Sequence, residues 1–282
     1  MAAYALMWSG GKDSALALSR ARASGLEVSL LLNFIDPQSR RVRFHATRAE
    51  LVAAQAEALG LPLRQLAVAW EGFEAVLTGE LSRLAEHGLA GVVFGDIHLA
   101  DVRAWYEQRV RAAGLGHLEP IWGESPASLL EEYVAGGGRA VVTCVEARHL
   151  DPSWLGRVTD PGFVSDIKRL PVDPCGENGE YHTFAFAGPG FSRPLEWVPG
   201  ERRDSEAGFH QLDLLAARCA HCGQPVDPQR YGLCAVCEQP VLCLDCARGH
   251  LCTDQCSARG CRAGLCVREV REGLPAVAYG VS

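Results

Sequence analysis

The sequence predicts an α/β fold, in which a doubly wound, mainly parallel sheet is followed by a small Cys-rich domain. Up to about residue 150, apolar strand-like runs alternate with helical stretches. Most of these runs are apolar throughout, which is typical of parallel strands covered on both faces. Ten of the twelve cysteines lie between Cys219 and Cys266. We therefore expect two domains, at residues 1–212 and 213–282.

The alternating pattern gives five strands and five helices. The strands are expected at 4–8, 28–34, 63–67, 91–94 and 140–145, and the helices at 13–24, 47–59, 70–87, 99–113 and 125–135. Ligands of doubly wound sheets bind beyond the carboxyl ends of the strands. A nucleotide-binding crevice is therefore expected to include residues 9–14, Asn33, Gly95 and Asp96.

Residues 9–14, S-G-G-K-D-S, form a glycine turn between the first strand and the first helix. This geometry offers unpaired backbone amides to an anion, and glycines let a phosphate approach the chain closely. Lys12 is one of only two lysines, in a chain whose other basic residues are arginines. Asp13 is expected to meet a magnesium ion or to cap the helix. The segment is neither a Walker A loop nor a G-x-G-x-x-G turn.

A second polar segment, C-G-E-N-G-E-Y-H-T-F, spans residues 175–184. Glu177 and Glu180 are suited to holding a metal, to taking a proton from an attacking amine, or to positioning ammonium. Asn178 offers both a donor and an acceptor. A polar surface turn is the alternative interpretation.

These two segments, together with F-G-D-I at 94–97, resemble the diphthine–ammonia ligase family of PP-loop ATP pyrophosphatases over about residues 1–200. The resemblance implies that ATP adenylates a carboxylate, releasing pyrophosphate, and that ammonia then displaces AMP to leave an amide. It implies ATP-phosphate binding by Ser9, Gly10, Gly11, Lys12, Asp13 and Ser14, and catalytic roles for Lys12, Asp13, Glu177, Asn178 and Glu180. The F-G-D-I-H-L spelling and the Arg-heavy composition resemble the bacterial branch of the family, which implies an acceptor other than diphthine.

Other residues near the expected crevice leave alternatives open. Asp96 is expected either to face the ligand or to cap the next helix. The basic segment 40–43 is either a solvated hairpin or an arginine-lined lip for the triphosphate or an acidic acceptor. His45, just before a helix start, is expected to be structural or to cap that helix, with a catalytic role as the alternative.

The cysteines of the Cys-rich segment are spaced as in zinc knuckles. Two Cys-x2-Cys pairs, at 219–222 and 234–237, are eleven residues apart, as in a tetrahedral zinc site. The predicted zinc ligands, for two sites, are Cys219, Cys222, Cys234, Cys237, Cys243, Cys246, Cys252, Cys256, Cys261 and Cys266. An iron–sulfur cluster is the alternative, because the spacings also suit cluster ligation.

The composition of the chain limits its possible cellular location and binding partners. The net charge of −7 and the pI near 5.7 argue against a large nucleic-acid footprint. No apolar run approaches the roughly 20 residues of a membrane span, and no signal peptide is evident, so we expect a cytoplasmic protein. The expected partners are ATP with magnesium, ammonium, an unidentified carboxylate acceptor and, in a homodimer, a second copy of the chain.

Two other functions remain open from the sequence. A PP-loop tRNA-thiolating enzyme with zinc knuckles would use Cys175 as a sulfur carrier. A nucleotide-binding interaction protein would bind ATP without turnover.

Overall fold

The computed structural model describes residues 2–43, 45–204, 208–219 and 222–227, and the backbone of strands at 230–234, 241–242 and 267–271. The chain divides into two compact units. One comprises residues 1–195 and 203–212, and the other comprises 196–202 and 213–282. One division between the units falls after residue 212, where the sequence places the domain boundary. The segment 196–202, which the sequence places in the first domain, belongs to the second unit.

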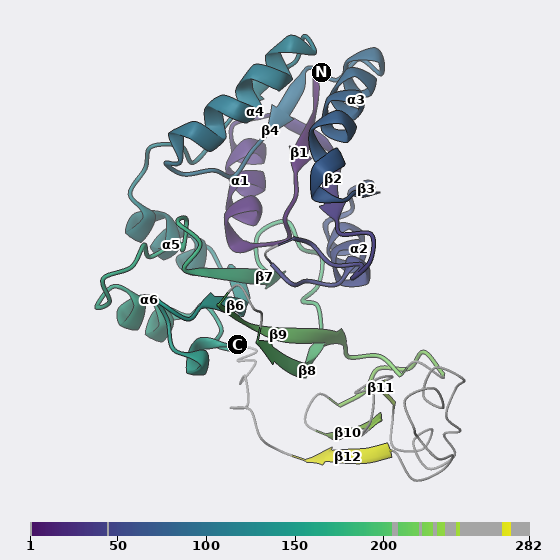
Figure 1. The fold of residues 1–282 in the computed structure, drawn as a ribbon, viewed down its shortest axis with the longest axis vertical. Coiled ribbons are helices and arrows are strands. Elements are labelled where there is room, and N and C mark those ends of the chain that lie inside the picture. The colour runs from purple at the N-terminus through teal and green to yellow at the C-terminus, as the bar shows by residue number, and fades with distance from the viewer. Residues whose placement is uncertain are drawn as a thin grey trace. The chain divides into compact units, whose positions relative to one another are not determined.

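A five-stranded sheet forms the centre of the first unit (Figure 1). Its strands are β1 (Ala3–Met7), β2 (Glu27–Ile35), β3 (Leu63–Ala67), β4 (Gly91–Val93) and β5 (Gly116–Leu118). Their order is β3-β2-β1-β4-β5, and every neighbouring pair is parallel. The order reverses between β1 and β4, which is where a doubly wound sheet binds its ligand. The predicted fold class is confirmed.

Helices follow the strands as the alternation predicts. They are α1 (Lys12–Ala23), α2 (Ala49–Leu59), α3 (Phe73–Glu86) and α4 (Ala100–Ala112), with a short 3-10 turn, η1 (Trp70–Gly72), before α3. Leu77, Leu81 and Leu84 recur along one side of α3 and pack with Val110 of α4 against the sheet. Right-handed crossovers place α1 and α2 on its opposite face.

A second sheet has the order β7-β6-β9-β8. It consists of β6 (Arg139–Glu146), β7 (Tyr181–Ala187), β8 (Trp197–Asp204) and β9 (Phe209–Ala216), and β6 pairs with β7 and β9 in antiparallel fashion. Three further helical elements are α5 (Pro126–Ala135), η2 (Pro152–Trp154) and α6 (Pro161–Ile167). The expectation that 140–145 belongs to the parallel sheet is therefore wrong. Its largely apolar sequence, broken only by the buried Thr143, reflects burial on both faces, which a central antiparallel strand also has.

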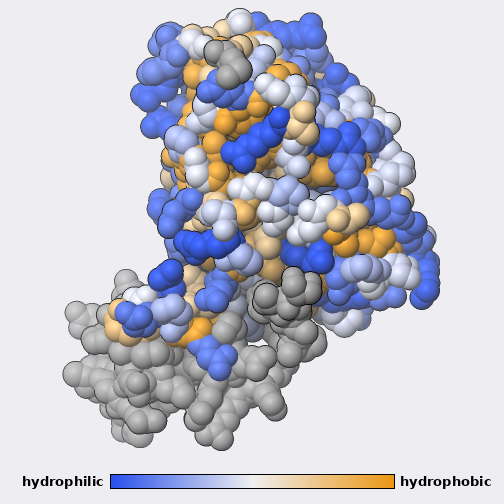
Figure 2. Space-filling model, turned by 180° about the vertical axis from the view of Figure 1, so that it is seen from behind, coloured by the Kyte–Doolittle hydropathy of each residue, from blue (hydrophilic) through white to orange (hydrophobic). Residues whose placement is uncertain are grey.

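Hydrophilic side chains cover most of the described surface on the face shown in Figure 2, and hydrophobic ones appear mainly between them. None of the helices among the described residues is both long enough and apolar enough to cross a membrane.

Three strands of the second unit are described by their backbone. They are β10 (Arg230–Cys234), β11 (Val241–Leu242) and β12 (Val267–Arg271), in the antiparallel order β11-β10-β12. Among the predicted zinc ligands, Cys219 is buried and Cys222 is exposed. The side chains of the other eight lie outside the described residues. The part of the chain whose side chains are described holds no group of three or more His, Cys, Asp or Glu residues able to bind a metal.

Candidate functional site

A cavity of about 920 Å³ is lined by the ends of β1, β2 and β4, the start of α1 and the segment before β7. Each segment that the sequence predicts to surround the nucleotide or to take part in the reaction contributes residues to this lining. Its lining includes Ser9, Lys12, Asp13, Ser14, Asn33, Gly95, Asp96 and Glu177. Gly10, Gly11, Asn178 and Glu180 lie outside this lining.

The glycine turn is held in shape by Gln55, a fully buried residue of α2. Its amide nitrogen donates to the Gly10 carbonyl at 2.9 Å, and its Oε1 accepts from Trp8 Nε1 at 2.9 Å. Gly10 has φ +84°, and a Cβ there would lie 2.7 Å from Gln55 Oε1. A side chain at Gly10 is therefore opposed both by the backbone conformation and by a buried neighbour.

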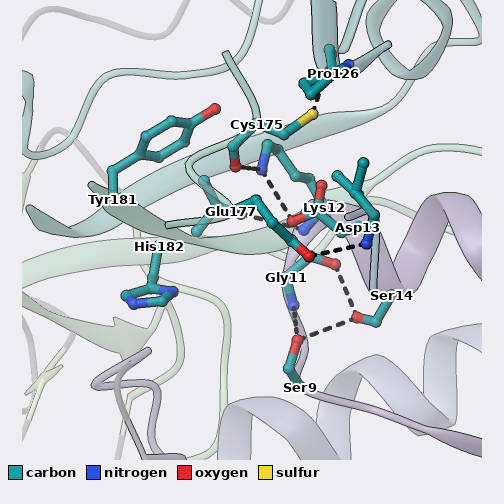
Figure 3. A network of polar contacts seen from close by, with 12 residues as sticks. Ser9, Gly11, Lys12, Asp13, Ser14, Pro126, Cys175, Glu177, Tyr181 and His182 are labelled. Carbon is teal, nitrogen blue, oxygen red and sulfur yellow. Dashed lines mark hydrogen bonds and ion pairs between the residues drawn. The ribbon is translucent and has the colours of Figure 1, made fainter. Parts of the chain in front are cut away.

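Gly11 is the N-cap residue of α1 and has no side chain with which to cap the helix. Around it, Ser9 Oγ accepts from the Gly11 amide at 3.2 Å, and Ser14 Oγ donates to the Gly11 carbonyl at 2.9 Å (Figure 3). The amide of Lys12 donates to Thr183 Oγ1 at 3.1 Å. Since Thr183 already accepts from the Lys12 amide, the amides of Asp13 and Ser14 and the positive end of the helix dipole can serve an anion.

Lys12 connects the glycine turn to the second polar segment. Its side chain is 3% exposed, and Nζ donates to Asp13 Oδ2 at 2.9 Å and to the carbonyl of Cys175. Nζ also lies 4.8 Å from the centre of the Tyr181 ring. Burial alone would lower the pKa of Lys12, but Asp13 and the neighbouring Tyr181 and Cys175 outweigh it and raise that pKa well above its ordinary value. Lys12 is therefore a fixed positive charge beneath the turn.

Three carboxylates interact across the cavity. Burial, then Asp13, raise the pKa of Asp96 to about 6. Burial, then Asp13 and Asp96, raise the pKa of Glu177 to about 7, although Glu177 Oε1 accepts from the Ile97 amide at 2.8 Å. Asp96 does not cap α4, whose N-cap is Leu99. Of the two alternatives for Asp96, the structure places it in the crevice.

The carboxylates of Asp13, Asp96 and Glu177 fit a magnesium ion only if the phosphates of a nucleotide supply further oxygen ligands. Among the described residues no three acids converge to hold a metal on their own. Magnesium is usually held by one or two carboxylates together with substrate phosphates and water. Asp13 and Asp96 meet this requirement beside the start of α1.

Glu180 and Asn178 shape the loop before β7. Glu180 is 3% exposed and accepts from the amide of Asp173 and the amide of Asn178, both at 3.0 Å, and from Asn178 Nδ2 at 3.1 Å. Asn178 itself is exposed. Of the three polar residues predicted to react, only Glu177 lines the cavity.

Cys175 is a buried thiol rather than an exposed nucleophile. It is 3% exposed, and Sγ donates to the Pro126 carbonyl at 3.1 Å. Burial raises the pKa of this thiol, despite the opposing effect of Lys12. Because the thiolate is the reactive form, this setting does not suit a sulfur carrier.

Two histidines in the cavity lining were not predicted as site residues. His45 Nδ1 lies 3.1 Å from the Thr183 carbonyl, and its ring centre lies 4.8 Å from that of His182. Burial lowers the pKa of both imidazoles, well below the ordinary value for His182. A carbonyl only accepts, so His45 Nδ1 is the donor. The partner is a backbone carbonyl, so no residue type in the sequence could have signalled this contact.

An aromatic wall, Phe34, Trp70, Phe73 and Trp105, lines another part of the cavity. Phe73 stacks on Trp70 at 5.9 Å and on Trp105 at 6.0 Å, and Trp70 is 60% exposed. The guanidinium of Arg43 lies 5.3 Å from the Trp70 ring. Flat aromatic faces of this kind can stack on a purine. Segment 40–43 combines both alternatives, because Val42 bridges to Ile35 as in a hairpin and Arg43 lines the cavity.

A five-stranded parallel sheet with a glycine turn after its first strand defines a doubly wound α/β protein whose ligand site lies where the strand order reverses. Two family models match it: the diphthamide synthase N-terminal domain over residues 2–117, and the diphthamide synthase C-terminal domain over residues 125–215. The chain belongs to the diphthamide synthase family.

Similar proteins agree with this assignment. The diphthine–ammonia ligases of Mus musculus and Homo sapiens are each 28% identical over 238 residues, covering 75% of this chain and 87% of theirs. The family and these relatives support an ATP-dependent, amide-forming carbon–nitrogen ligase, the enzyme class that the sequence predicts. The U34-tRNA thiolase NcsA from Methanococcus maripaludis, solved with its 4Fe-4S cluster, is 15% identical over 46% of this chain and 56% of its own. Its TM-score of 0.30 is too low to carry an argument.

Proposed function

We propose that the chain uses ATP to adenylate a carboxylate, with loss of pyrophosphate, and then replaces AMP by ammonia to give an amide. The observation that carries this proposal is the composition of one cavity. It combines the first turn of α1 with the carboxylates of Asp13, Asp96 and Glu177. An anion and a cation can therefore be bound side by side.

In the adenylation step, the amides of Asp13 and Ser14 in the first turn of α1 bind the triphosphate, and Lys12 adds a buried positive charge. Asp13 and Asp96 hold magnesium through their carboxylates, together with phosphate oxygens. The ion, when bound, neutralises charge that develops on the pyrophosphate leaving group. The aromatic wall formed by Phe34, Trp70, Phe73 and Trp105 is the proposed surface for the adenine ring.

In the amide-forming step, Glu177 takes a proton from the attacking nitrogen. A pKa of about 7 lets this carboxylate exchange a proton near neutral pH, as a general base requires. The Ile97 amide fixes one of its oxygens at 2.8 Å. Glu180 and Asn178 act indirectly, by holding the loop that presents Glu177.

The acceptor is a carboxylate, carried by a protein or by a small molecule. The relatives are named for diphthine, whereas the bacterial-type spelling of residues 94–99 favours another carboxylate for this chain. A cytoplasmic location, a homodimer and two zinc sites in the Cys-rich segment remain predictions from the sequence.

The proposal is tested by incorporation of labelled nitrogen. Purified full-length protein is incubated with ATP, magnesium, ¹⁵N-ammonium and an extract of its source cells. We expect an ATP-dependent product that carries the heavy isotope as an amide. The Asp13→Asn and Glu177→Gln variants should lose it, while Glu57→Gln, a change at an exposed surface ion pair with Arg193, should retain it. Equal labelling by all four proteins would contradict the proposal.

A further inference from the structure

A contact between His98 and Asp173 joins two loops that both contribute to the cavity lining. His98 Nε2 lies 2.8 Å from Asp173 Oδ2, and because a carboxylate oxygen accepts, Nε2 is the donor. His98 belongs to the loop between β4 and α4, and Asp173 to the loop between α6 and β7 that carries Glu177. His98 and Asp173 lie outside the lining themselves, so any effect on the reaction must act through other residues.

The same two loops meet at a second contact, one residue earlier in the first loop. The Ile97 amide donates to Glu177 Oε1 at 2.8 Å, and the next residue, His98, holds Asp173. Two consecutive residues therefore fix two points of the second loop, four residues apart. Two fixed points restrict the rotation of that loop as well as its distance, which a single hydrogen bond to Glu177 cannot do.

The Asp173 carboxylate also holds the turn that presents Glu177. Its other oxygen, Oδ1, accepts from the Cys175 amide at 2.7 Å. The Cys175 carbonyl in turn accepts from Lys12 Nζ (Figure 3). The Asp173 side chain is 8% exposed, so water competes little for its hydrogen bonds. This carboxylate therefore bridges His98 and the turn before Glu177.

The position of Glu177 relative to the first loop matters for the proposed chemistry. That loop also supplies Asp96, a proposed magnesium ligand, so it borders the place where the adenylate forms. A general base works only within hydrogen-bond reach of the proton it takes, about 2.6–3.2 Å between heavy atoms. A misplacement of about 1 Å can lower a rate about 10²-fold. A second contact that fixes the two loops to each other therefore bears directly on the base.

We propose that His98 and Asp173 are positioning residues that hold Glu177 beside the adenylate for the amide-forming step. This inference rests on the proposed function and deepens the role of Glu177 in it. Ammonia forms a bond to the acyl carbon, one of its protons passes to Glu177, and the bond from that carbon to the AMP oxygen breaks with its electron pair on AMP. Loss of the contact between His98 and Asp173 leaves the phosphate-binding turn in place, so it slows this step and not adenylation.

The first test follows the position of Glu177 without substrates, through hydrogen exchange of the Ile97 amide in the full-length protein. Exchange should be at least tenfold faster in His98→Ala and in Asp173→Asn, whose side chain keeps one acceptor oxygen but turns an NH₂ donor toward His98. His98→Gln, which can still donate to Asp173, should restore protection. The matched control His210→Ala removes another His–Asp contact, of 2.6 Å and outside the cavity lining, and should leave the exchange unchanged. Unchanged exchange in both His98→Ala and Asp173→Asn would overturn the proposal.

The second test separates the two chemical steps in single-turnover reactions, with an extract of the source cells supplying the acceptor. His98→Ala should release pyrophosphate within a few-fold of the wild-type rate but form the ¹⁵N-amide at least tenfold more slowly, and His98→Gln should recover most of that rate. Adding His98→Ala to Asp173→Asn should cause no further loss, because both changes break the same contact. Equal slowing of both steps, or additive losses in the double variant, would contradict the assignment.

The two tests distinguish failure of this inference from failure of the proposed function. Faster exchange of the Ile97 amide in the variants, with no amide formed by the wild type, would leave the positioning of Glu177 standing and refute the proposed function. Unchanged exchange in the variants, with amide formed by the wild type, would refute the positioning and leave the proposed function standing.

Discussion

Replacement of Glu177 by Gln should stabilise the protein at high pH while it removes activity. The folded environment raises the pKa of Glu177 from 4.5 to about 7, chiefly through burial. Between these two values the folded protein binds more protons than the unfolded chain, so the wild type loses stability as the pH rises. The Gln side chain carries no charge and can still accept from the Ile97 amide.

The size of the effect follows from the pKa rise. One pH unit corresponds to about 1.4 kcal/mol, so with a pKa raised from 4.5 to about 7 the ionised carboxylate costs the folded state at most about 3.5 kcal/mol above pH 7. Partial exposure to solvent reduces this to about 1–2 kcal/mol. For a folded domain of this size, the Tm of Glu177→Gln should exceed that of the wild type by roughly 2–8 °C at pH 8. Near pH 5 the folded wild type is protonated, so the difference should be small.

The assay is thermal unfolding of wild type, Glu177→Gln and the surface control Glu57→Gln at pH 5 and pH 8, followed by the intrinsic fluorescence of the six tryptophans, which include the buried Trp8. Amide formation by the wild type should rise as the pH passes through about 7, because the base must be ionised. It should fall about 10²–10⁴-fold in Glu177→Gln. Equal stability of Glu177→Gln and wild type at pH 8 would refute the argument about burial. Full activity of Glu177→Gln would refute its role as a base.

Three further changes separate the roles of neighbouring residues. Gly10→Ala should weaken ATP binding at least tenfold, because φ is +84° and the methyl would lie 2.7 Å from Gln55 Oε1; Gly25→Ala, with φ +82° and no atom within 4 Å, should leave equilibrium ATP binding unchanged. Glu180→Gln should destabilise the fold by about 1–3 kcal/mol in urea unfolding, because one loop donor loses its acceptor, and equal midpoints would contradict that role. Cys175→Ser should keep AMP formation within a few-fold of wild type, whereas complete loss would restore the sulfur-carrier hypothesis.

The glycine turn could be predicted because its chemistry is local. A strand, two glycines and a helix start are contiguous in residues 4–18, and the structure shows that arrangement. The partners that hold the turn are far away in the chain: Gln55 contacts Gly10 across 45 residues, and Thr183 contacts Lys12 across 171. The periodicity of apolar residues along the chain carries no information on contacts between such distant residues.

The same limit explains why the prediction that both Glu177 and Glu180 act at the reacting end of the site fits only Glu177. Glu177 lines the cavity and Glu180 is buried under the loop, because Gly176 and Gly179 turn the chain with φ +73° and +95°. Residue type alone could not distinguish them. The strand β5 (Gly116–Leu118) was missed for another reason, since Gly-His-Leu is not an apolar run, unlike the equally short β4.

The central claim is cleavage of ATP between the α and β phosphates, and the fate of ATP labelled on both the α and γ phosphates tests it most directly. Purified protein is incubated with magnesium, ammonium and an extract of its source cells that supplies the acceptor. The account predicts that the α label appears in AMP and the γ label in pyrophosphate, and that Asp13→Asn forms neither. Labelled ADP and inorganic phosphate from the wild type, in place of AMP and pyrophosphate, would contradict it.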